Sequence, residues 1–75
     1  MNNTRRREIR NAISQLQSLS FNLGMVRLEE SLALSNIPDC FANTDRANNM
    51  EDALAYIGDA QQAIYESIDA LNNIN

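Results

Sequence analysis

Apolar residues recur in alternating steps of three and four along two stretches of this chain, on either side of a short break that contains Pro38. Heptad spacing sustained over several turns predicts helices that pack side by side along an apolar seam. The first stripe consists of Ile9, Ala12, Leu16, Leu19, Leu23, Val26, Glu30 and Ala33, and the second of Met50, Leu54, Ile57, Gln61, Ile64, Ile68 and Leu71. The pattern therefore predicts an all-α fold in which two helices form an antiparallel hairpin.

Short polar residues mark where the two predicted helices begin. We expect one domain over residues 1–75, with a helix at about 4–35, a turn at 36–43 and a helix at about 44–72. Asn3 or Thr4 is predicted to cap the first helix, because such side chains accept hydrogen bonds from the free N–H groups of a first turn. The second helix is predicted to begin near Thr44 or Asp45, with Asn48 and Glu51 as another capping pair if it begins later. Pro38 interrupts the pattern, since the residue before a proline is pushed out of helical geometry.

Length and composition point to self-association. A chain of 75 residues, 44% of them apolar, buries a modest share of its surface and usually needs disulfides, metal or other copies of itself for stability. Cys40 is the single cysteine and there is no histidine, so neither an intrachain disulfide nor a zinc cluster is expected. One unpaired thiol fits a reducing, cytoplasmic setting. Cys40 is expected to be an ordinary loop or core residue, and Phe41 to cap the open end of the core.

The first helix carries a second apolar stripe from its midpoint onward. Its members are Phe21, Met25, Leu28 and Leu32. At 100° per residue this stripe lies nearly opposite Leu16, Leu23 and Val26, and a helix that is apolar on both sides must be covered on both sides. We therefore predict that these four residues form an oligomer interface, with a second copy or a foreign protein, and that a dimer makes a four-helix bundle.

The second helix has a matching flank of small residues. This flank consists of Ala53, Ala60, Ala63, Ser67 and Ala70, with Tyr56 among them, and is expected to admit a third helix. Glu30 and Gln61 lie in the two seams, where polar residues usually set register or oligomeric state. Gly58 is expected on the solvated side.

Positive charge is concentrated at the start of the chain and negative charge in the second helix. Arg5, Arg6, Arg7 and Arg10 form the basic cluster, while Asp52, Asp59 and Glu66 line an acidic face that is a candidate contact surface. Three interpretations of the arginines stay open: pairing with Glu66, Asp69 and the terminal carboxylate of the same hairpin; binding of a phosphate-bearing nucleic acid or nucleotide; or contact with an acidic protein. Without interleaved aromatic residues or lysines, the nucleic-acid signal is weak.

Catalytic and metal-binding chemistry find little support. Histidine, lysine, a glycine-rich phosphate loop and a nucleophile–base pair are all missing from the sequence, so an enzyme is not expected. The acidic residues near the turn, Asp39, Asp45, Glu51 and Asp52, do not follow the spacing of a calcium loop. We expect no cofactor and no metal, and no apolar run approaches the roughly 20 residues that span a bilayer.

A group of short segments carries a family resemblance. They are Glu29-Glu30, Asn36-Ile37-Pro38, Thr44-Asp45-Arg46 and Met50-Glu51-x-Ala53-Leu54. In this order, over about residues 29–71, they resemble a pattern of short helical-hairpin proteins encoded by phages, prophages and other mobile elements of Gram-positive bacteria. The chain departs from that pattern in its less acidic tail and its arginine-rich start. The resemblance implies a hairpin and a phage origin, but it assigns no functional residues.

Three functions remain as expectations. The first is a small, non-enzymatic, self-associating phage accessory protein that binds and modulates a host protein in the bacterial cytoplasm, for example as an inhibitor of a defence system. The second is a hairpin dimer that binds nucleic acid or a nucleotide through Arg5, Arg6, Arg7 and Arg10. The third is a purely structural assembly module.

Overall fold

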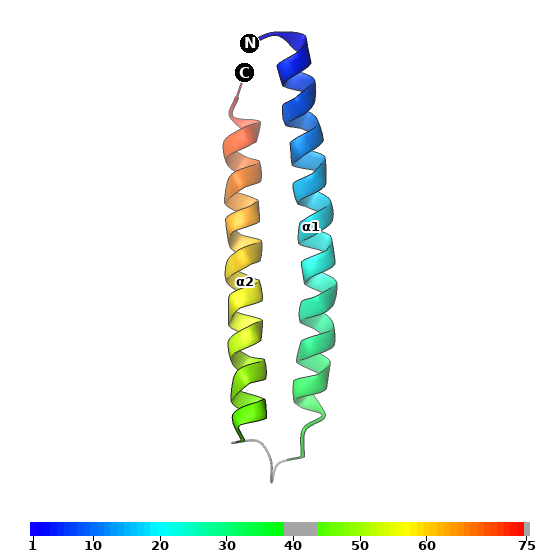
Figure 1. The fold of residues 1–75 in the computed structure, drawn as a ribbon, viewed down its shortest axis with the longest axis vertical. Coiled ribbons are helices and arrows are strands. Elements are labelled where there is room, and N and C mark those ends of the chain that lie inside the picture. The colour runs from blue at the N-terminus through cyan, green and yellow to red at the C-terminus, as the bar shows by residue number, and fades with distance from the viewer. Residues whose placement is uncertain (39–43, 75) are drawn as a thin grey trace.

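Two long helices make up the computed structural model, which describes residues 1–38 and 44–74. Helix α1 spans Asn3–Ser35 and helix α2 spans Asp45–Asn72. They run antiparallel, so both termini lie at the same end of the molecule (Figure 1). The predicted all-α helical hairpin is confirmed, while dimerisation stays a prediction. Cys40 and Phe41 lie outside the described residues.

Side-chain caps fix the start of each helix. The Asn2 Oδ1 atom accepts a hydrogen bond of 2.8 Å from the Arg5 N–H, so the cap lies one residue before the predicted Asn3 or Thr4. The Thr44 Oγ1 atom accepts from the Ala47 N–H at 3.3 Å, which confirms Thr44 as the cap of α2. Such caps satisfy N–H groups that have no partner within the helix.

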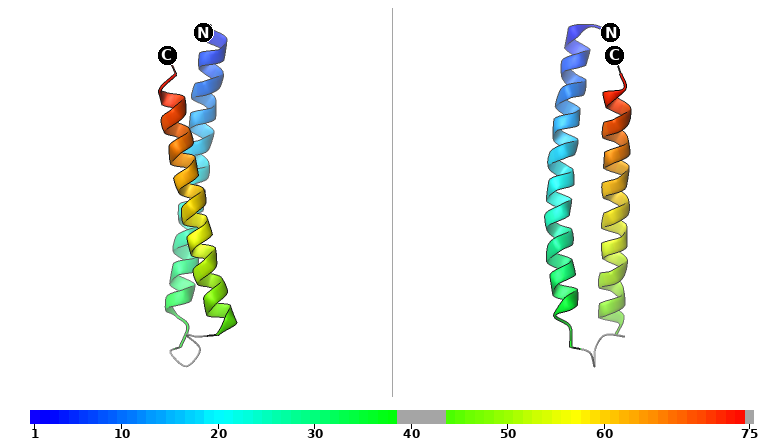
Figure 2. Two further views of the ribbon diagram at one scale, coloured as in Figure 1. Left: turned by 90° about the vertical axis from the view of Figure 1, so that its left-hand side faces the viewer. Right: turned by 180° about the vertical axis from the view of Figure 1, so that it is seen from behind.

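The described chain forms one layer that is two helices wide (Figure 2). Its extents are 60 × 15 × 13 Å and its radius of gyration is 17.3 Å, whereas a compact domain of this length has a radius of about 11 Å. Its accessible surface of 5793 Å² exceeds by roughly 1,200 Å² the value of about 4,600 Å² expected for a folded monomer of this mass. A single hairpin therefore leaves an unusually large share of its surface in water.

The seam of α2 is the one predicted, because all seven members of its stripe are buried or half-buried. Its best-buried residues are Ala47 and Met50, which are 1% and 9% exposed. These two positions lie near the turn and anchor that end of the hairpin.

The seam of α1 differs from the predicted stripe. Leu19 and Val26, predicted to be inside, are 53% and 47% exposed, and Ala33 is exposed as well. Ser20 is buried and Gly24 half-buried in their place. The other members of the predicted stripe, Ile9, Ala12, Leu16, Leu23 and Glu30, are half-buried as expected. The seam therefore keeps these residues and is turned toward Ser20 and Gly24 in place of Leu19, Val26 and Ala33.

Candidate interaction surfaces

The predicted second stripe of α1 forms a ridge that the hairpin does not cover. We call it the outer stripe: Phe21, Met25, Leu28 and Leu32, which are 70%, 47%, 54% and 55% exposed. At 100° per residue it lies about 145° round α1 from the seam and runs for roughly 16 Å along the helix. Contiguous exposed apolar side chains on a small protein mark a surface for another molecule.

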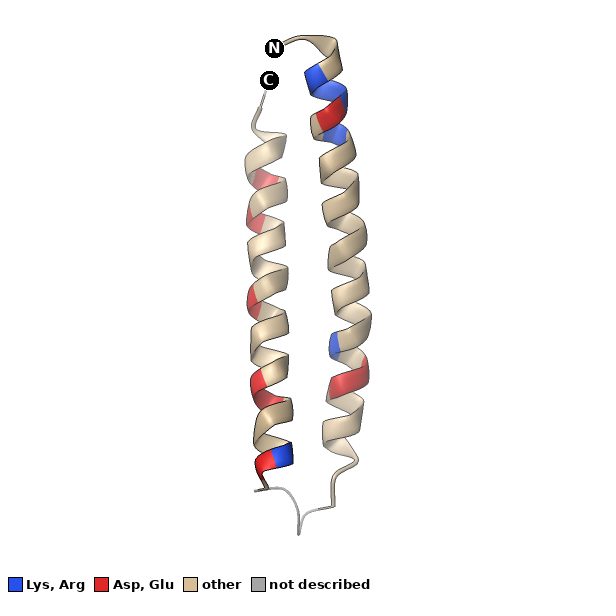
Figure 3. Cartoon of the chain, viewed as in Figure 1, with Lys and Arg blue, Asp and Glu red and all other residues tan. Residues whose placement is uncertain are grey.

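The middle of α1, where the outer stripe begins, carries no charged residue. No charged residue occurs between Arg10 and Arg27, so the middle of α1 is free of blue and red in Figure 3. Charge is depleted at the centre of protein interfaces, where desolvating it is costly. The first half of the outer stripe, Phe21 and Met25, therefore lies in uncharged surroundings that suit an apolar partner, whereas exposed Glu29 borders the second half, between Met25 and Leu32.

A second uncovered surface lies on one side of the helix pair. We call it the flank: exposed Leu19 and Val26 on α1, with exposed Ala60 and Ser67 and half-buried Ala53 on α2. Gly24 and Gly58 turn toward the opposite side of the seam, where Gly24 approaches Gln61 and Gly58 approaches Arg27. Helical periodicity then brings the members of the flank together on the other side. Large side chains of α1 lie here beside small ones of α2.

A polar layer joins the helices on the glycine side. The Arg27 Nη1 atom donates to Gln61 Oε1 at 3.3 Å, and Gln61 Nε2 donates to the backbone oxygen of Ser20 at 3.4 Å. Both glycines of the chain lie in this layer. A Cβ atom on Gly58 would meet the Arg27 guanidinium at 3.5 Å, and one on Gly24 would meet Gln61 Nε2 at 3.4 Å.

The polar layer corrects the expectation for Gly58 and contains one residue, Arg27, that was not predicted. Gly58 is half-buried under Arg27 instead of solvated. The sequence did not single out Arg27 as a contact residue, although a glycine in each helix near the polar seam residue Gln61 is a signal for it. Glu30 is half-buried in the seam, and within the described residues it forms no bond with Gln61.

The four N-terminal arginines lie at the open end of the hairpin. In residues 1–38 and 44–74, none of them pairs with a carboxylate, Glu66 and Asp69 included. Asn75, with its terminal carboxylate, is outside the described residues. The positive charge also opposes the dipole of α1, which has no acidic residue in its first turn.

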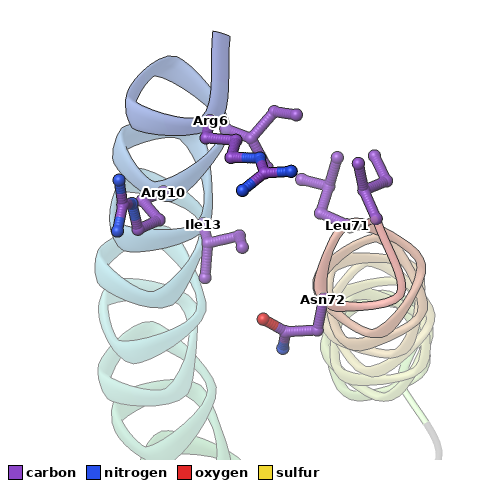
Figure 4. A pocket seen from close by; sticks show the side chains of 7 residues that line it. Arg6, Arg10, Ile13, Leu71 and Asn72 are labelled. Carbon is purple, nitrogen blue, oxygen red and sulfur yellow. The ribbon is translucent and has the colours of Figure 1, made fainter. Parts of the chain in front are cut away.

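An open hollow of about 270 Å³ lies between the start of α1 and the end of α2. Arg6 and Arg10 are at its rim, and its apolar lining comes from Ile9, Ile13, Leu71 and Ile74. In Figure 4 the Arg6 guanidinium reaches toward Leu71, whereas the side chain of Arg10 is directed away from α2. The hollow therefore combines one inward cation with an apolar floor.

Three carboxylates of α2 make up the acidic face, whose role as a contact surface stays a prediction. Asp52, Asp59 and Glu66 are exposed, and at 100° per residue their spacing of seven places them on one face of α2. Figure 3 shows acidic residues spread along this helix. Gln62 Nε2 donates to Glu66 Oε1 at 3.4 Å, a bond between neighbours on one helix face. The three carboxylates are spread along the helix, so they form a diffuse field and no compact site.

The described residues offer neither a cluster of metal ligands nor a helix suited to span a membrane. Residues 1–38 and 44–74 contain no group of three potential metal ligands. Neither of the two described helices combines the length and apolar character of a transmembrane span. No protein-family model, curated protein or solved structure matches this chain.

Proposed function

We propose that this chain is a small non-enzymatic binding protein that docks a partner protein on the outer stripe of α1. The supporting observation is the exposure of Phe21, Met25, Leu28 and Leu32, which are 47% to 70% accessible in the hairpin. Complete burial of such a side chain is worth about 1.5–3 kcal/mol, so covering what remains exposed is worth roughly 1 kcal/mol each.

The chemistry of the stripe indicates what kind of partner it fits. Its four side chains follow one helix face at spacings of four, three and four residues. That is the geometry of a helix laid into an apolar groove or against another helix. The partner therefore presents an apolar groove or helix face about three turns long.

The resemblance to phage and mobile-element hairpins is the basis for proposing a class of partner. A protein of that origin meets the proteins of a bacterial host, and we propose that the partner is one of them, whose activity changes when the stripe is bound. Self-association belongs to the same proposal, because a hairpin with so little core gains stability from a second copy.

The test compares the tagged full-length chain with Met25→Gln/Leu28→Gln in pull-downs from a bacterial lysate, with captured proteins identified by mass spectrometry. A protein held through the stripe is enriched by the natural chain and lost with this variant. The two changes remove roughly 2 kcal/mol of apolar burial, which corresponds to about 30-fold weaker binding. The identified protein is then purified and its dissociation constant measured with both chains.

The matched control is Asn22→Gln, a polar change at another exposed position of α1. It is expected to capture the same protein as the natural chain. Equal capture by the stripe variant and the natural chain refutes docking on the outer stripe.

A second candidate is a binder of nucleic acid or a nucleotide. It is favoured by the absence of a carboxylate partner for Arg5, Arg6, Arg7 and Arg10 within the described residues. Binding that falls steeply with salt, and disappears in Arg5→Ala/Arg6→Ala/Arg7→Ala, would support it. Host-protein capture that survives this triple change favours the first function. A purely structural module would capture only its own copies.

A further inference from the structure

The flank is a surface distinct from the outer stripe, and its shape specifies an occupant. We propose that a second copy of this chain docks on the flank, so that two hairpins pack face to face as a four-helix bundle in which α1 of each copy lies on α2 of the other. The inference concerns a different surface from the one proposed to bind a host protein. It rests on the self-association included in the proposed function and identifies the surface that carries it.

The angle between the flank and the seam suits a four-helix bundle, whereas the angle between the outer stripe and the seam does not. Leu19 and Val26 lie roughly 65–85° round α1 from its seam, and Ala60 lies about 80° round α2 from the opposing seam. Adjacent sides of a square bundle differ by about a right angle. Packing through the outer stripe alone, about 145° from the seam, would instead place four helices in a row.

The positions of the flank residues along the hairpin axis determine how two copies can interdigitate. Gln61 contacts Ser20, and Gly58 lies beside Arg27. These two contacts fix which residues of α1 and α2 lie at the same height along the hairpin axis. With equal rise per residue, Ser67, Ala60 and Ala53 lie level with Leu16, Leu23 and Glu30.

A two-fold axis parallel to the helices keeps these levels while it places α1 over the α2 of the other copy. Leu19 then falls between the levels of Ala60 and Ser67, and Val26 between those of Ala53 and Ala60. Large side chains over gaps between small ones are the packing on which helical bundles depend.

Charge favours the same pairing of helices. Helix α1 carries five arginines and three glutamates, a balance of +2. Helix α2 carries Arg46 against six acidic residues, a balance of −5. Placing α1 on α2 brings opposite charges together, whereas the other two-fold arrangement stacks the two acidic helices on each other. All neighbouring helices are also antiparallel in the proposed bundle, so their dipoles oppose.

The area needed is present. A standard interface covers about 800 Å² per partner, and the hairpin exposes roughly 1,200 Å² more than a compact monomer of its mass. The bundle also covers Leu19 and Val26, which are half exposed in the hairpin, and it leaves the outer stripe on the outside for another protein.

Sedimentation equilibrium of the full chain tests the proposal with two matched double variants. Leu19→Gln/Val26→Gln alters the flank, and Met25→Gln/Leu28→Gln alters the outer stripe with the same number and kind of changes. We expect the natural chain and the stripe variant to dimerise, and the dissociation constant of the flank variant to rise by at least roughly 100-fold. A natural chain that is monomeric at roughly 0.5 mM overturns the proposal, as does a stripe variant that is monomeric beside a dimeric flank variant.

Disulfide cross-linking tests the pairing of helices without relying on a weakened dimer. In a Cys40→Ser background, Leu19→Cys/Ala60→Cys is expected to give covalent dimers under mild oxidation, because the thiol introduced at position 19 of one copy then lies beside α2 of the other copy, about one helical turn from position 60. The single variants Leu19→Cys and Ala60→Cys are expected to stay uncoupled. Single variants that cross-link as fully as the double one place like helices together and refute the arrangement.

Discussion

Replacement of Gly58 by alanine is expected to stabilise the hairpin, although Gly58 lies at the contact between the helices. Gly58 is inside α2 and has no positive φ angle, so it does not need the conformational freedom of glycine. Alanine in a helix interior is about 0.8–1.0 kcal/mol more favourable than glycine. The sign of the overall effect therefore depends on what the added methyl group meets.

The methyl group would meet the end of a flexible side chain. The nearest atoms to a Cβ at position 58 are Arg27 Nη2 at 3.5 Å, Cζ at 3.6 Å and Nη1 at 3.7 Å. These are ordinary van der Waals distances, and Arg27 is exposed, so its guanidinium has room to shift. We expect a net gain of about 0.5–1 kcal/mol, which is roughly 2–8 °C in melting temperature for a domain of this size.

Thermal unfolding followed by circular dichroism at several protein concentrations measures the gain and separates it from any change in association. Ala55→Gly is the matched control, because Ala55 is exposed on the same helix three residues away and reports helix propensity alone. Its loss should equal the gain of Gly58→Ala within a few tenths of a kcal/mol. A fall in melting temperature for Gly58→Ala refutes the reasoning, since it would mean that the helices need bare backbone at this contact.

Two further substitutions test the end of the hairpin near the turn. Ala47→Leu should destabilise the hairpin by about 1–3 kcal/mol through overpacking, because Ala47 is 1% exposed, whereas Ala55→Leu should be nearly neutral; urea unfolding of both variants decides. Thr44→Ala removes the acceptor of the Ala47 N–H and should cost about 1 kcal/mol, measured in the same way with Thr44→Ser as the variant that retains the cap.

The sequence predicted α2 well because hydrophobic periodicity alone defines its seam. The large apolar residues between Met50 and Leu71 fall on one face of the helix, and no second stripe of large residues competes with that face. The cap at Thr44 and the helix ends at Ser35 and Asn72 followed from local chemistry in the same way. Local signals suffice where only one arrangement satisfies them.

The seam of α1 was predicted less well because this helix has more large apolar residues than one seam can hold. Periodicity favoured Leu19 and Val26, yet Ser20 and Gly24 face α2 in the hairpin. Hydrophobicity ranks leucine above serine, but the distance between two helices depends on side-chain size. The choice of side also depended on Gln61 and Arg27, whose hydrogen bonds join residues far apart in the sequence.

Leu19 and Val26, which were predicted to lie in the seam, form part of an exposed surface instead. If Leu19 and Val26 lay in the seam, the hairpin would have one uncovered apolar surface, the outer stripe. Because they lie on the flank at about half exposure, helix α1 carries both the flank residues and the outer stripe, in directions roughly 130–150° apart. One helix can then contact its own chain, a second copy and a foreign protein at once, which joins self-association and partner binding in a chain of 75 residues. On this view, changes on the flank weaken partner binding only through the loss of a second copy, whereas changes on the outer stripe weaken it directly.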